Sequence, residues 1–263
     1  NKANINMVRI VPGLDEYTIE IVYTIPDMSP KEDNGRYASI DLGLNNLATI
    51  TSNVKELKPV IINGKPLKSI NQFYNKRLAY YKSKLEKTNK KKHSKRTRWL
   101  TNKRNKKIDD YLHKSSRLII NMLKEKEINT LVIGKNANWK QDINIGKTNN
   151  QNFVSVPYSR FINMLVYKCE MDGIRTVLQE ESYTSKASFL NNDYIPIHSK
   201  RHENKYVFSG YRQSRGLYKI KGCNVVINAD VNGSYNILRK AFPNIIDGIE
   251  GFAVIPVIIT ITN

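Results

Sequence analysis

The run Tyr37-Ala-Ser-Ile-Asp-Leu-Gly43 is a short apolar stretch that carries one acidic side chain, Asp41, near its end. Its length and composition predict a buried strand that stops at a glycine. Ile40 and Leu42 would be buried, and a lone carboxylate among them is costly unless it has a partner or a function. Asp41 is therefore either a metal ligand on a central strand or a strand-end aspartate that accepts backbone amides, and this stretch alone leaves both open.

The segments around this strand alternate between strand and helix patterns. Residues 47–51 and 60–62 continue an antiparallel meander, the latter ending at the turn pair Asn63-Gly64. Residues 69–127 have two helical apolar stripes and predict a long helical hairpin. Further elements are expected in the order strand, helix, strand, helix at residues 130–133, 158–171, 174–178 and 230–241. This order predicts an α/β fold of the RNase H type, preceded by two strands within residues 7–24.

The composition points to a polyanionic partner. The chain has 43 Lys and Arg residues against 23 Asp and Glu residues, a net charge of +20. Such an excess repels itself unless a polyanion neutralises it, and nucleic acid phosphates do so with release of counterions. Much of the charge lies at the expected tip of the hairpin and in the basic and aromatic stretch 183–222. A solvated charged face is the simpler alternative for both regions.

The residues expected to bind nucleic acid share a cationic side chain in one of these two regions. They are Lys90, Lys91, Lys92, Lys95, Arg96, Arg98, Lys103 and Arg104 in the hairpin, and Lys186, Arg212 and Arg215 in the later stretch.

Several classes of protein are disfavoured. The two cysteines, Cys169 and Cys223, lie far apart and form no CxxC pair, so we expect neither a disulfide framework nor a zinc site. No apolar run has the length of a transmembrane helix, and no signal peptide is recognisable. We therefore expect a cytoplasmic protein without a membrane partner; nothing in the sequence indicates an oligomeric state.

Three segments together resemble the TnpB/OrfB family of insertion-sequence proteins. Ile40-Asp-Leu-Gly-Leu-Asn-Asn-Leu-Ala-Thr49 is similar to the first RuvC motif of that family, and Asn228-Ala-Asp-Val-Asn-Gly-Ser-Tyr-Asn-Ile-Leu-Arg239, preceded by Gly216-Leu-Tyr218, is similar to the third. The middle region from Gly146 to Lys186 is also similar. The resemblance implies a RuvC-like domain, Asp41 and Asp230 as ligands of Mg²⁺ or Mn²⁺, and guide RNA and target double-stranded DNA as partners. For Asp230, a plain helix N-cap remains the alternative.

The second motif departs from the family pattern. Most members have a glutamate at the end of the fourth strand, where this chain has Gly134. Either the site has lost an acid, or another glutamate supplies the ligand, and Glu181 at the end of the fifth strand is the candidate. Strand alternation would place Glu180 and Glu181 on opposite faces, so only one of them would point inward.

The expected domains follow from these motifs. Residues 36–66, 130–182 and 223–243 would form the RuvC-like domain, with the basic helical hairpin 67–129 inserted. Residues 183–222 would be a degenerate zinc-ribbon-like insert that binds nucleic acid, and residues 244–263 a tail. Residues 1–30 resemble the end of an amino-terminal β (wedge-like) module that is otherwise missing, so we expect a truncated copy.

The resemblance implies an RNA-guided DNA endonuclease that hydrolyses phosphodiester bonds by a two-metal mechanism, with Asp41, Glu181 and Asp230 as catalytic residues. One alternative is a nuclease-dead or truncated RNA-guided DNA-binding protein or repressor. Another is a structure-specific RuvC nuclease without a guide. Such sequences are often labelled transposases, but nothing in this one favours strand transfer over hydrolysis.

Overall fold

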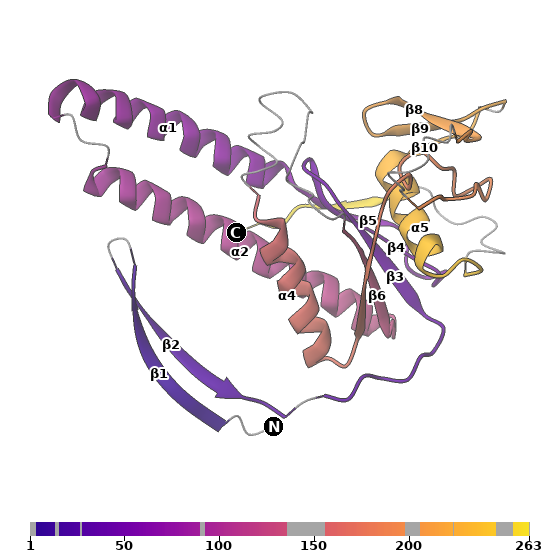
Figure 1. The fold of residues 1–263 in the computed structure, drawn as a ribbon, viewed down its shortest axis with the longest axis horizontal. Helices are drawn as coiled ribbons and strands as arrows, with labels where there is room; N and C mark the ends of the chain where they lie inside the picture. The colour runs from indigo at the N-terminus through magenta and orange to yellow at the C-terminus, as the bar shows by residue number, and fades with distance from the viewer. Residues whose placement is uncertain are drawn as a thin grey trace.

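The computed structural model describes residues 4–13, 16–26, 28–89, 93–135, 156–197, 206–222, 224–245 and 255–262. Its centre is a six-stranded mixed sheet in the order β11-β5-β4-β3-β6-β7 (Figure 1). The strands are β3 (Tyr37–Leu42), β4 (Asn46–Ser52), β5 (Val60–Asn63), β6 (Thr130–Gly134), β7 (Arg175–Gln179) and β11 (Val257–Ile259).

The first three of these strands form the predicted antiparallel meander. β3 pairs with β4 and β4 with β5 in antiparallel registers, whereas β6 runs parallel to both β3 and β7. The run that contains Asp41 is therefore a central strand with a neighbour on each side. Because side chains alternate along a strand, Ala38, Ile40 and Leu42 join one core cluster while Ser39 and Asp41 face the opposite side of the sheet.

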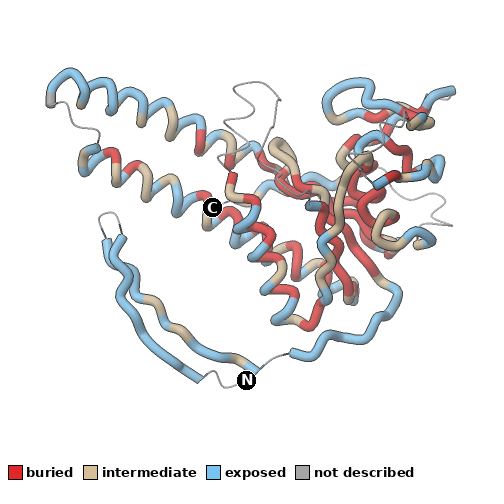
Figure 2. The backbone as a smooth tube through the Cα atoms, viewed as in Figure 1, coloured by how far each residue is buried: buried red, intermediate tan, exposed pale blue. Residues whose placement is uncertain are grey.

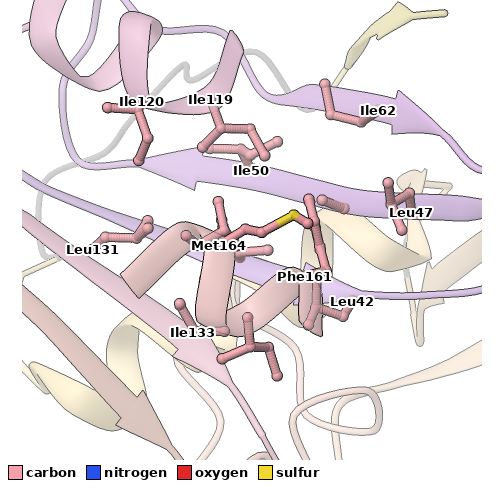
Figure 3. Packing of buried hydrophobic residues seen from close by; sticks show 14 of the residues in the cluster. Leu42, Leu47, Ile50, Ile62, Ile119, Ile120, Leu131, Ile133, Phe161 and Met164 are labelled. Carbon is pink, nitrogen blue, oxygen red and sulfur yellow. The ribbon is translucent and has the colours of Figure 1, made fainter. Parts of the chain in front are cut away.

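Helices cover both faces of the sheet (Figure 1). One face packs against α2 (Lys95–Glu125) and α4 (Tyr158–Met171), and the other packs against α5 (Ala229–Ala241). Figure 3 shows the first of these cores, in which side chains of the two helices meet those of the strands: Ile119, Ile120, Phe161, Met164, Ile50, Leu42, Leu131 and Ile133. Val132 faces the other way and joins Ile237 and Leu238 of α5.

The helical hairpin consists of α1 (Lys65–Asn89) and α2, which leave the sheet together (Figure 1). Ser94 begins α2 with a capping box, since it accepts from Thr97 N while the Thr97 side chain accepts from Ser94 N. Tyr74 of α1 and Thr101 of α2 join the two helices by a hydroxyl hydrogen bond of 3.1 Å. Across the described ranges, no helix combines the length and apolarity that a membrane crossing requires.

The amino-terminal strands β1 (Asn4–Pro12) and β2 (Tyr17–Thr24) form a separate antiparallel ribbon that is exposed along most of its length (Figure 2). An ion pair of 2.6 Å between Glu16 and Lys106 connects its turn to α2. The following segment reaches the sheet through hydrogen bonds to the end of α2. Arg36 donates to Lys126 O and Asn34 to Glu127 O.

Two regions contain more regular structure than the sequence indicated. The stretch 183–222, expected to be loop-rich, contains β8 (Gly210–Ser214) and β9 (Leu217–Ile220), which form a second sheet with β10 (Val226–Asn228). The expected tail supplies β11, which lies parallel to β5 at the edge of the main sheet. These strands have three to five residues and depend on tertiary pairing, so local patterns do not reveal them.

Candidate functional site

Asp41 lies on the face of β3 that α5 covers. The helix comes close to it at Gly233, where a Cβ atom would lie 2.7 Å from Oδ2 of Asp41. A Cβ atom does not come that close to an oxygen atom in proteins, so glycine at this position makes room for the carboxylate. The partly buried Asp41 is thus held between a central strand and a helix that can approach it closely.

Asp230 stands in the first turn of the same helix, and it is not the cap. The side chain of Asn228 caps α5 by accepting from Asp230 N and Val231 N at 2.9 and 3.1 Å. The carboxylate of Asp230 instead accepts from Asn46 Nδ2 at 2.6 Å and from Arg212 Nη2 at 3.1 Å. The N-cap alternative for Asp230 is therefore wrong, because Asn228 already fills that role.

Glu181 lies beside the glycine that ends β6. A Cβ atom at Gly134 would lie 2.7 Å from Oε2 of Glu181 and 2.6 Å from Cδ1 of Ile237 on α5. The carboxylate therefore reaches from the end of β7 into the space that a side chain at the end of β6 would fill. The absence of a side chain at Gly134 therefore provides the space that the Glu181 carboxylate needs.

Glu180 also turns toward α5, contrary to the alternation argument. Its carboxylate forms an ion pair with Lys240 Nζ and accepts from Ser182 N at 2.6 Å. The prediction that Glu180 and Glu181 point to opposite faces is wrong, because β7 ends at Gln179 and the alternation of a strand no longer applies. Lys240 distinguishes the two glutamates instead, and the sequence contained no signal for this pair.

The electrostatic environment separates these acids. Burial raises the pKa of Asp41 well above its ordinary value, the carboxylates of Glu181 and Asp230 raise it further, and Arg212 opposes them. Burial and Glu180 raise the pKa of Glu181 to about 7. For Glu180, burial raises the pKa, but the hydrogen bonds from Lys240 and Ser182 outweigh it and leave that pKa below its ordinary value. A nearby cation would therefore stabilise the ionised carboxylates of Asp41 and Glu181 more than that of Glu180.

A cleft of about 520 Å³ opens at this end of the sheet. Acidic and basic side chains line it together: Asp41, Asp230, Lys65, Arg212 and Arg215. The amide of Asn45, oriented with its oxygen toward Arg215, accepts from that guanidinium at 3.1 and 3.2 Å. Lys65 and Asn46 were not predicted, since a single lysine after a turn and an asparagine in a strand carry no sequence signal for a site.

Carboxylate oxygens are the ligands that Mg²⁺ and Mn²⁺ prefer, and the two glycines leave space for the carboxylates of Asp41 and Glu181. In this respect the residues fit a divalent metal. Within the described part of the chain, however, no three His, Cys, Asp or Glu side chains stand close enough together to hold a metal ion. The backbone brings Asp41, Glu181 and Asp230 to one region, and their side chains are not gathered around one point.

Two neighbouring asparagines have structural roles. Asn228 is the cap described above, and the buried Asn232 binds the loop after β7 by donating to Ala187 O and accepting from Phe189 N. They fix the start of α5 and the loop beside it.

The predicted nucleic-acid-binding residues differ in solvent exposure and in their contacts with other side chains. Lys95, Arg96 and Lys103 are exposed on α2, whereas Arg104 is partly buried and donates to Asn71 of α1 at 2.8 Å. Arg104 thus connects the two helices by a side-chain hydrogen bond. Lys186 is exposed beside the ring of Tyr183, and Arg98 is partly buried. Three of the predicted residues lie outside the described ranges: Lys90, Lys91 and Lys92.

The chain matches two described families in succession. Residues 20–140 match OrfB_IS605, "Probable transposase", and residues 158–237 match "Cas12f1-like, TNB domain". No curated protein sequence matches significantly.

The solved structures that share the fold include two complexes. One, the "Cryo-EM structure of the Cas12f1-sgRNA-target DNA complex", is 18% identical with a TM-score of 0.53, and the match covers 88% of this chain and 55% of that one. The other, the "Cryo-EM structure of CRISPR-Cas12f Ternary Complex", is 16% identical with a TM-score of 0.52, covering 88% and 44%. The chain therefore spans about half the length of these proteins. The likeness confirms the predicted α/β fold class, and the two successive family matches confirm the resemblance to the TnpB/OrfB family.

Proposed function

We propose that this chain is the catalytic half of an RNA-guided DNA endonuclease, which hydrolyses phosphodiester bonds with Mg²⁺ or Mn²⁺ held by Asp41, Glu181 and Asp230. One observation carries the proposal: the carboxylate of Glu181 occupies the space beside Gly134 where most family members have their glutamate. The acid of the second motif is thus relocated to the neighbouring strand.

The roles of the three acids follow from their surroundings. When bound, a divalent metal would activate water and stabilise the leaving oxygen of the phosphodiester. Burial raises the pKa values of Asp41 and Glu181, and the Glu181 carboxylate raises that of Asp41 further, so a bound cation would offset the cost of burying these negative charges. Asp230 is held by Asn46 and Arg212, which orient its carboxylate toward the cleft that Asp41 also lines.

The proposed partners are guide RNA and target double-stranded DNA. The support is the net charge of +20, the exposed cations of α2 and the cationic side chains of the cleft. The two structurally similar proteins were solved as complexes, one of which is described as containing sgRNA and target DNA. In such a system the guide reads the sequence while the protein holds the duplex by its backbone.

A matched pair of substitutions tests the proposal. With guide RNA and matched DNA in Mg²⁺, Glu181→Gln should reduce the cutting rate by at least about a hundredfold and leave DNA binding within about twofold, because the amide keeps the shape and loses the charge. Glu180→Gln should keep most of the activity, since that carboxylate is paired with Lys240. Equal loss in both variants would contradict the assignment of Glu181.

A second candidate is an RNA-guided DNA-binding protein that no longer cuts. It is favoured by the contacts of Asp230 with Arg212 and Asn46, and by the lack of a three-acid cluster within the described residues. Tight binding of matched DNA without cutting in either Mg²⁺ or Mn²⁺ would support this candidate and overturn the first.

A further inference from the structure

A hollow of about 280 Å³ lies between α1 and α2, and it shares no lining residue with the cleft that contains Asp41 and Asp230. One side chain of its lining is an exposed aromatic ring, Phe73, and three others are cationic: Lys103, Arg104 and Lys107. No acidic side chain of the described residues lines it. The site is preformed, because the Tyr74–Thr101 and Asn71–Arg104 hydrogen bonds join the two helices beside it.

Phe73 is a phenyl ring left largely in solvent. It is 59% exposed, although such a ring normally gains stability by burial. Arg77 lies over the ring at 5.7 Å from its centroid, so the ring is held between a cation and the hollow. An exposed aromatic ring beside several cations is the combination that binds unpaired nucleotides, whose bases stack and whose phosphates need positive charge.

Helix α1 runs from the cleft to the hollow. Lys65 at the start of this helix lines the cleft, and Ser69 and Phe73, four and eight residues later, line the hollow. Eight residues of α-helix span about 12 Å. Stacked nucleotides rise about 3.4 Å each, so a strand that leaves the cleft along α1 reaches Phe73 within about four nucleotides.

We infer that this hollow binds an unpaired nucleotide of the DNA strand that occupies the cleft of Asp41 and Asp230. The base would stack on Phe73, and its phosphate would lie against Lys103 and Lys107. This inference rests on the proposed function for the identity of the strand, and it adds a positioning subsite within about four nucleotides of the cutting site.

Binding measurements test the subsite without any cutting. We would measure the affinity for a short fluorescent thymidine oligomer in Ca²⁺, as a single strand and as a duplex, for the wild type, Phe73→Ala, Phe73→Tyr and Tyr80→Ala. Phe73→Ala should weaken single-strand binding roughly five- to a hundredfold while duplex binding stays within about twofold. Phe73→Tyr should restore the affinity, because it keeps an aromatic face.

Tyr80→Ala is the matched control. Tyr80 is an exposed aromatic residue on the same helix with its own cation, Lys84, but it does not line the hollow. Its loss should change single-strand binding by less than about twofold. Equal effects of Phe73→Ala and Tyr80→Ala, equal loss for single strand and duplex, or a loss confined to a uridine RNA oligomer would each overturn the inference.

The outcome is independent of nuclease activity. If the protein fails to cut but shows the Phe73-dependent affinity for single strands, the subsite is supported and the proposed function is contradicted. If the protein cuts but its affinity for single strands does not depend on Phe73, the proposed function is supported and the subsite is contradicted.

Discussion

At the scale of single residues, Gly134 and Glu181 have to be considered together. The sequence showed that the second motif lacks its acid and that Glu181 lies on the next strand, so the candidate could be named in advance. It could not show that the carboxylate of Glu181 comes within 2.7 Å of where a Cβ at position 134 would be. Nor could it show the Lys240–Glu180 pair, since residues 60 apart in sequence meet only through the packing of α5.

Gly134→Ala should therefore impair both folding stability and cutting. The added methyl group would overlap Glu181 and Ile237 and cost about 1 to 3 kcal/mol of unfolding free energy, measurable by denaturant titration. The double variant Gly134→Ala/Ile237→Val should recover much of that stability but little activity, because the Glu181 carboxylate remains displaced. Full activity in the single variant would show that the Glu181 carboxylate does not need this space.

The raised pKa of Glu181 predicts a pH-dependent difference in stability between metal-free wild type and Glu181→Gln. Folding raises this pKa from 4.5 to about 7, so the protonated form favours the folded state. That stabilisation is complete below pH 4.5 and is lost as the pH rises toward 7. Relative to the variant, the wild type should lose roughly 1 to 3 kcal/mol over this range in thermal or chemical unfolding. A constant difference would mean that Glu181 is solvated.

At the scale of elements, α5 is the helix that organises the site. It carries Asp230, makes room for Asp41 at Gly233, and is anchored to the sheet by Ser234, which donates to Thr49 O at 3.0 Å and accepts from Thr51. Its position in the sequence was predicted to within one residue at its start. Its cap was not, because Asn228 and Asp230 are both good capping residues and only the backbone geometry distinguishes them.

Removing the cap of α5 should affect the site as well as stability. Asn228→Ala should cost about 0.5 to 2 kcal/mol, since Asp230 N and Val231 N lose their acceptor, and Asn228→Ser should retain most of it. Because Asp230 lies two residues after the cap, in the first turn of α5, the alanine variant should also cut more slowly at subsaturating Mg²⁺. An alanine variant with wild-type stability would contradict the role of this cap.

At the scale of the whole molecule, the cationic side chains differ in whether an acidic side chain neutralises them. The sequence predicted a cationic hairpin, and the structure distinguishes its residues by their partners. Lys95, Arg96 and Lys103 are exposed without an acidic partner among the ion pairs of the described residues. Toward the carboxyl end of the helix, three lysines pair with acids: Lys114, Lys124 and the C-cap Lys126. Local sequence could not make this distinction, because Asp172, the partner of Lys124, lies on a different segment.

The triple variant Lys95→Gln/Arg96→Gln/Lys103→Gln should bind all DNA sequences more weakly. The dependence of log affinity on log salt should decrease by about one unit for each phosphate that the variant no longer neutralises. Lys114→Gln/Lys124→Gln/Lys126→Gln removes the same charge from the paired end of the helix and should change this slope little. Identical slopes for both triple variants would mean that only net charge matters.

The central claim, that Glu181 supplies the missing third carboxylate, is tested most directly by titrating the protein with Mn²⁺ in a calorimeter. We expect the wild type and Glu180→Gln to bind Mn²⁺ with similar affinity and Glu181→Gln to bind it at least about tenfold more weakly. This measurement needs neither a guide nor cutting. Unchanged Mn²⁺ affinity in Glu181→Gln, or a loss in Glu180→Gln instead, would contradict the claim.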